Sequence, residues 1–179
     1  MKPGTDRSVI TIETTRQDHR IAWLTALAIT IHIAESVLPS PLPGVKPGLA
    51  NVVTIAVLML YGWRTAMWVS LLRVLVGSIL IGTFLTPTFT LSLAGAVSSL
   101  LVLGLGGLLP GRGLGPVGYS LLAALAHMAG QFMVAYWLFI PHQGLFGLLP
   151  VLMSMAALFG LVSGLIVMAM VAKLKERTS

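Results

Sequence analysis

The chain has 179 residues and a formal net charge of +6; 56% of its residues are hydrophobic and only 9% are charged. A soluble domain usually carries charge on about a quarter of its residues. Too few charged residues remain here to cover a water-exposed surface, so the composition favours a membrane protein. The absence of cysteine excludes disulfides, thiolate catalysis and cysteine-based metal sites.

The basic residues gather at the two ends of the apolar region. They are Lys2, Arg7, Arg16 and Arg20 before the first apolar run, and Lys173, Lys175 and Arg177 after the last. Basic residues that flank apolar runs set the orientation of a membrane protein. The basic charge therefore predicts membrane orientation, and we expect no nucleic acid partner.

Residues 1–19 are polar and are predicted to form a cytoplasmic N-terminal tail. The first apolar run, residues 20–38, is long enough to span a bilayer and ends at a proline-rich stretch, residues 39–44, that breaks any helix. The next two runs, residues 49–63 and 65–84, are separated by a tight hinge. They are predicted to form an antiparallel hairpin.

Three further apolar runs follow, separated by loops rich in glycine and proline: residues 88–109, 117–140 and 145–172. We therefore predict an all-α integral membrane protein. Its core would be a six-transmembrane-helix bundle over residues 20–172, with the N- and C-termini cytoplasmic and a basic tail at residues 173–179.

The loops support this orientation by their charge. With the N-terminus inside, the inner segments hold nine basic residues, whereas the outer loops hold only Lys46. This bias agrees with the rule that positive charge stays in the cytoplasm. We expect a multi-pass protein of the cytoplasmic membrane, in contact with the lipid bilayer.

Arg73 lies near the middle of the third run. A central arginine costs at least ~2.5 kcal/mol in a bilayer, so it should face the interior of the bundle and have a partner there. Glu35 is the only acidic residue between Arg20 and Lys173 and is the internal carboxylate available to it. The two side chains either fix helix packing or belong to a ligand site in which Arg73 meets an anionic group.

Three residues near Glu35 are further candidates for a substrate site. His32 shares a helix face with Glu35 and either orients it or lines a wet interface. Lys46, in the outer loop, either caps a pocket or extends to the membrane interface. Asn51 lies just inside the second run and could add an amide contact.

His127 and Gln131 are four residues apart in the fifth run, on one helix face. Such a pair bridges helices by hydrogen bonds or lines a site. No paired intramembrane carboxylates, no catalytic motif and no metal-ligand cluster occur. We therefore expect no enzyme activity, no metal and no cofactor.

Small residues recur at the spacing that lets helices pack closely. Ala22 and Ala26 form such a pair in the first run, and Gly160 and Gly164 form one in the sixth. At about 100° per residue, the alanine pair points away from the helix face that carries Glu35. The face that carries the two alanines could dock a partner or pack within the bundle.

Three stretches carry a family resemblance: Glu35 with residues 43–51 (Pro-Gly-Val-Lys-Pro-Gly-Leu-Ala-Asn), then Arg73, then residues 92–96 (Ser-Leu-Ala-Gly-Ala). Over residues 20–172 the chain resembles the Gx transporter family, also named heptaprenyl diphosphate synthase component I. That family is similar in turn to the substrate-binding S components of energy-coupling-factor (ECF) vitamin transporters.

The resemblance to S components implies a six-helix bundle with an outward-facing pocket under the first loop. The ligand would be a small anionic, isoprenoid or vitamin-like molecule captured for uptake. It also implies docking onto a membrane T component driven by two ATPases, through an Ala-x-x-x-Ala element that Ala22 and Ala26 match.

The synthase name implies an alternative, a non-catalytic membrane subunit beside a prenyl transferase in heptaprenyl diphosphate or quinone synthesis. This chain lacks the aspartate-rich motifs with which such a transferase binds Mg²⁺ and diphosphate. The resemblance therefore allows a subunit of the synthase but not its catalytic chain.

Overall fold

A computed structural model describes residues 14–37, 49–107 and 114–178. Six α-helices and two short helical segments make up this part of the chain, and it holds no strand. In order they are α1 (Arg16–Val37), α2 (Leu49–Tyr61), α3 (Trp63–Ile81), α4 (Pro87–Gly106), α5 (Pro116–Val134), the π-helix η1 (Ala135–Phe139), the 3₁₀ helix η2 (Gln143–Leu148) and α6 (Leu149–Thr178). The prediction of an all-helical fold is confirmed for these residues.

Four helical segments are long and apolar enough to cross a membrane: Trp63–Ile81, Pro87–Gly106, Pro116–Phe139 and Gln143–Leu174. The chain is therefore a multi-pass membrane protein. The predicted six spans and their sidedness stay predictions, because α1 and α2 do not meet the same criteria. With 13 residues, α2 is about 20 Å long, less than the ~30 Å of a hydrocarbon core.

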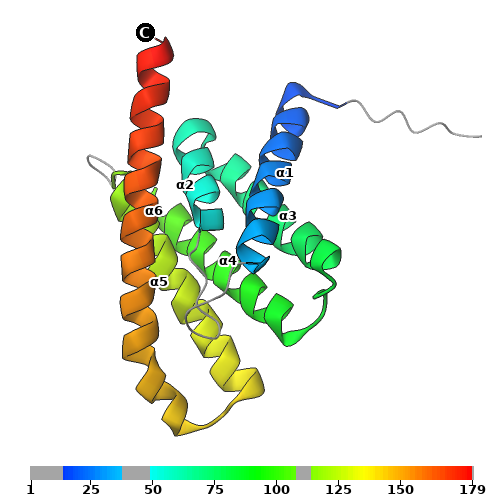
Figure 1. Ribbon diagram of the computed structural model, residues 1–179, viewed down its shortest axis with the longest axis vertical. Helices are drawn as coiled ribbons and strands as arrows, with labels where there is room; N and C mark the ends of the chain where they lie inside the picture. The colour runs from blue at the N-terminus through cyan, green and yellow to red at the C-terminus, as the bar shows by residue number, and fades with distance from the viewer. Residues whose placement is uncertain (1–13, 38–48, 108–113, 179) are drawn as a thin grey trace, which may run out of the picture.

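The helices form one closed bundle (Figure 1). α1 packs on α2 and α3, α5 lies between α4 and α6, and α2 contacts both α5 and α6. The start of α1 and the end of α6 lie at the same end of the bundle, and the connection between α5 and α6 lies at the opposite end (Figure 1).

An apolar cluster lies in the half of the bundle in which α1 begins and α6 ends. Its most deeply buried members come from four helices: Ile55, Leu103, Ala123 and Val167. The buried charged side chains of Glu35 and Arg73 are not part of this cluster.

A capping box begins α1. The Thr15 backbone N–H donates to Oδ2 of Asp18 at 2.8 Å, and the Asp18 N–H donates to Oγ1 of Thr15 at 3.3 Å. The Thr15 hydroxyl adds a third hydrogen bond to the same carboxylate, at 2.7 Å. These bonds from the backbone and the hydroxyl of Thr15 hold the pKa of Asp18 below its ordinary value.

Glycines in the left-handed backbone region make two of the turns. Gly62, with φ 84°, is the single residue between α2 and α3, which confirms the predicted tight hinge. Gly82, with φ 75°, caps α3, and its N–H donates to the Ile79 carbonyl. Thr86 and Pro87 then begin α4, because proline suits the first helical turn.

Two glycines bring α6 close to α5. A Cβ atom on Gly164 would lie 2.6 Å from Cα of Val117, and one on Gly160 would lie 2.9 Å from Cβ of Ala124. The two helices can approach each other this closely only because α6 has no side chains at these two positions. The small-residue pair predicted in the sixth run therefore packs α6 against α5 inside the bundle.

The helix ends differ from the predicted runs where local hydrogen bonding decides them. α1 begins at Arg16, four residues before the predicted start at Arg20, because the Thr15 cap satisfies its first turn. α3 ends at Ile81 and not at Phe84, because Gly82 adopts a left-handed conformation. α1 begins among polar residues, and the apolar run continues past the end of α3, so hydropathy alone locates neither point.

Candidate functional site

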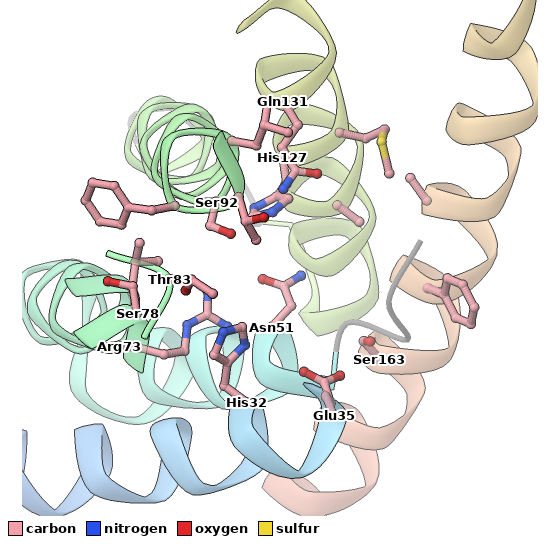
Figure 2. A pocket seen from close by; sticks show the side chains of 18 of the residues that line it. His32, Glu35, Asn51, Arg73, Ser78, Thr83, Ser92, His127, Gln131 and Ser163 are labelled. Atoms are coloured by element: carbon pink, nitrogen blue, oxygen red, sulfur yellow. The ribbon is translucent and has the colours of Figure 1, made fainter. Parts of the chain in front are cut away.

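A cavity of about 330 Å³ lies in the half of the bundle away from the start of α1 and the end of α6, and all six α-helices line it (Figure 2). Its lining comes from the C-terminal parts of α1 and α3, the N-terminal parts of α2 and α4, and the facing stretches of α5 and α6. The polar lining residues are His32, Glu35, Asn51, Arg73, Ser78, Thr83, Thr88, Ser92, His127, Gln131 and Ser163.

Arg73 is the buried cation of this cavity. Its side chain is 8% exposed and extends from α3 into the space between the helices (Figure 2). The Nε atom of Arg73 is buried and finds no hydrogen-bond partner among the described residues. An unpaired guanidinium donor is costly in a membrane interior, so the unmet donor of Arg73 marks this part of the cavity as a candidate site for an acceptor.

Glu35, at 3% exposed, lines the same cavity from α1. It lies near enough to Arg73 for the two charges to attract each other. The predicted proximity of the only internal carboxylate and the central arginine is therefore present in the structure. Together the two side chains keep the formal charge of the cavity close to neutral.

His32 and Asn51 lie next to this charged pair in the lining. The ring of His32 lies next to Gly77 of α3, where an added Cβ atom would lie 3.4 Å from Cδ2, an ordinary van der Waals contact. Asn51 comes from the first turn of α2. The side chain of Asn51 points toward the enclosed space (Figure 2).

His127 lines the cavity from α5 and is held there by α4. Its Nδ1 lies 3.3 Å from Oγ of Ser99, and its ring rests against Gly95. A Cβ atom on Gly95 would lie 2.5 Å from Nε2 of His127. His127 thus contacts α4 and also lines the cavity; a function in binding stays a prediction.

Six of the seven residues predicted for a substrate site line this single cavity: His32, Glu35, Asn51, Arg73, His127 and Gln131. The seventh, Lys46, lies outside the described residues. Ala22 and Ala26 are exposed on α1, apart from the buried Glu35 on the same helix. Their binding and docking functions stay predictions.

Several hydroxyl side chains line the cavity but were not predicted, among them Ser78, Thr83 and Ser163. Serine and threonine can bond to the carbonyl of the preceding helical turn, so they are unremarkable in an apolar run. Ser78, for example, donates to the Leu75 carbonyl at 2.8 Å. Only Ser92 carried a sequence signal, as part of the stretch that resembles a family.

No group of three or more histidine or acidic residues in the described part of the chain could hold a metal ion. The site is a polar cavity, with one buried arginine, inside a helical membrane protein. This defines the class of protein as a multi-pass membrane protein with a small-molecule-sized chamber.

The chain belongs to the family described as heptaprenyl diphosphate synthase component I, whose model matches residues 24–170. The family predicted from the sequence is thereby confirmed. No curated protein and no solved structure matches the chain.

Proposed function

We propose that this protein is the substrate-binding subunit of an uptake system, similar to an ECF S component, and that it captures a small organic anion from the outer face. The observation that carries the proposal is the buried Arg73, which lines the cavity and whose Nε has no hydrogen-bond partner in the described residues. Intramembrane arginines usually mark binding or transport sites.

Two further features of the cavity favour an anionic group. Asn51 in the first turn of α2 lines the cavity, so the N-terminal end of this helix borders it. Helix N-termini carry a partial positive charge. Glu35 would balance Arg73 when the cavity holds no anion, and the anion would share Arg73 when it binds.

The size of the cavity favours a short molecule. Its volume of about 330 Å³ is at the small end of the range of 300–1,000 Å³ that is common for ligand pockets. A long polyprenyl chain would not fit inside it. Apolar lining residues such as Val74, Phe89 and Phe159 would hold the uncharged part of the ligand.

An energising partner would dock on α1. Ala22, Trp23, Ala26 and Leu27 are all exposed, Trp23 to 78%. The resemblance to S components supports a T component with two ATPases as the occupant of this face. A face with two small residues lets a partner helix approach closely.

Mass spectrometry of small molecules that co-purify with the protein tests the binding proposal. Arg73→Gln should lose at least ~90% of the bound anion, because the charge-assisted hydrogen bond is gone. Arg64→Gln, on the exposed first turn of the same helix, is the matched control and should retain the anion. Equal retention by both variants would contradict the proposal.

Arg73→Gln must also fold for this result to count. Its elution as a monodisperse species in detergent, like the parent protein, shows that binding and not assembly was lost. If Arg73→Gln aggregates and the parent protein co-purifies with no anion, Arg73 fixes helix packing and the binding proposal is wrong.

A second candidate function is favoured by the printed family name. As a component of a heptaprenyl diphosphate synthase, the chain would be a non-catalytic membrane subunit beside a prenyl transferase. It would then need a docking face but no ligand. Neither function requires this chain to carry out a reaction.

Co-purification from native membranes separates the two functions. Recovery of a T component with two ATPases supports uptake, whereas recovery of a prenyl transferase supports the synthase function. Ala26→Trp should abolish the uptake assembly by blocking close approach to α1. Leu165→Trp, at an exposed position of α6, is the control and should leave the assembly intact.

A further inference from the structure

α4 presents a face of small residues toward α5. Ser92, Gly95 and Ser99 are spaced three and four residues apart and so lie on one side of the helix. Ser92 lines the cavity, while Gly95 and Ser99 contact the ring of His127. The imidazole therefore lies in a notch that only glycine leaves open, and its orientation is fixed.

The hydrogen-bond geometry around Ser99 favours Nδ1 of His127 as the ring nitrogen that carries hydrogen. Its Oγ lies 2.9 Å from the Gly95 carbonyl and 3.0 Å from the Ala123 carbonyl, and both carbonyls can only accept. The single hydroxyl hydrogen therefore goes to a carbonyl. At 3.3 Å from Nδ1 of His127, Oγ is then left to accept from an Nδ1–H.

A neutral ring with hydrogen on Nδ1 keeps a lone pair on Nε2. The neutral form is the one compatible with this site, because burial in the bundle disfavours a charged ring and because Arg73 places a positive charge in the same lining. Nδ1 is turned toward Ser99, so the opposite edge of the ring, which carries Nε2, is left to line the cavity. That edge would offer a hydrogen-bond acceptor and not a donor.

We infer that His127, positioned by Ser99 and Gly95, selects ligands that carry a hydroxyl or N–H donor in addition to their anionic group. This inference rests on the proposed function and narrows its substrate class to small hydroxylated or N–H-bearing organic anions. Arg73 and His127 enter the cavity from different sides (Figure 2), so the anionic group and the donor lie at separate ends of the ligand.

Matched probes test the selectivity of the purified protein in detergent. One series is the ω-hydroxycarboxylates from hydroxybutanoate to hydroxyoctanoate, with the corresponding ω-hydroxyalkyl phosphates, and the other is their methyl ethers. The best hydroxy compound should bind about tenfold more tightly than its ether, because an ether cannot donate to Nε2. His127→Phe should bind both compounds equally.

The two proposals fail in different ways. If no acid of either series raises the melting temperature of the parent protein, the binding proposal fails and this inference fails with it. If acids bind, but hydroxy compounds and ethers bind equally, the inference alone is overturned.

Nitrogen-15 NMR of histidine-labelled protein tests the positioning role of Ser99. The chain has four histidines, and His127→Gln assigns the resonances. Nδ1 of His127 should be protonated, and only the Nε2 signal should move when the best ω-hydroxy acid is added. A protonated Nε2, or an Nε2 signal that the same acid does not move, would overturn the inference.

Ser99→Ala should mix the two tautomers and reduce the preference for hydroxy compounds severalfold. Ser98→Ala is the matched control, since this neighbouring hydroxyl lies against Gly130 and not against His127. An unchanged tautomer and unchanged selectivity in Ser99→Ala would show that Ser99 serves packing alone.

Discussion

The opposite charges of Arg73 and Glu35 line one cavity inside the membrane-spanning bundle, where a buried charge is energetically costly. Removing one partner of such a pair leaves the other uncompensated and is usually more harmful than removing both. Arg73 and Glu35 were identifiable from the sequence because they are charged residues inside apolar runs. The hydroxyl groups around them were not, because serine and threonine satisfy themselves locally.

The notch at Gly95 gives a prediction about stability. Gly95→Ala should lower the free energy of unfolding by about 1–3 kcal/mol, because its Cβ would overlap the His127 ring and force a shift. Adding His127→Ala should recover most of this loss. Thermal unfolding in detergent of both single variants and the double variant measures the coupling, and additive losses would contradict the overlap.

The capping box of α1 gives a prediction about pH. Because the folded protein lowers the pKa of Asp18, its contribution is present above the unfolded pKa and is lost as pH falls through the folded pKa. The start of α1 should therefore fray only in strong acid. In a carbon-13 NMR titration, Thr15→Ala should raise the Asp18 pKa part of the way toward its ordinary value, because the hydroxyl bond is lost while the backbone N–H bond remains; no change would rule out the Thr15 hydroxyl as a cause.

Individual helices were predicted with uneven accuracy. Hydropathy located each apolar run, but hydrogen bonding at Thr15 and Gly82 decided where helices begin and end. The fifth run contains a switch from the α-helix α5 to the π-helix η1. A π-helical turn is set by tertiary packing and has no clear sequence signal.

The close contact between α5 and α6 predicts that the protein is sensitive to added side-chain volume on α6. Gly164→Ala should destabilise the protein by about 1–3 kcal/mol, because its Cβ would lie 2.6 Å from the backbone of Val117. Gly147→Ala, where nothing lies within 4 Å, should change stability little. Equal melting temperatures for the two variants would show that the helices are less tightly packed than the structure indicates.

The sidedness of the whole molecule was predicted from the distribution of basic residues and is open to direct measurement. The chain has no cysteine, so each introduced thiol is unique. A membrane-impermeant maleimide applied to intact cells should label Leu85→Cys and Gly147→Cys but not Arg64→Cys or Lys173→Cys. Labelling of Arg64→Cys from outside would contradict the six-span topology.

On their helices, the apolar cluster residues Ile55, Leu103, Ala123 and Val167 lie nearer than the cavity-lining residues to the end of the bundle at which α1 begins and α6 ends. We therefore expect this cluster to close the chamber on that side, so that a molecule that enters it leaves by the way it came unless these helices part. Vesicles reconstituted with this chain alone should retain ligand in proportion to the protein and accumulate none in their lumen. Progressive filling of the lumen without any other protein would show that the barrier leaks.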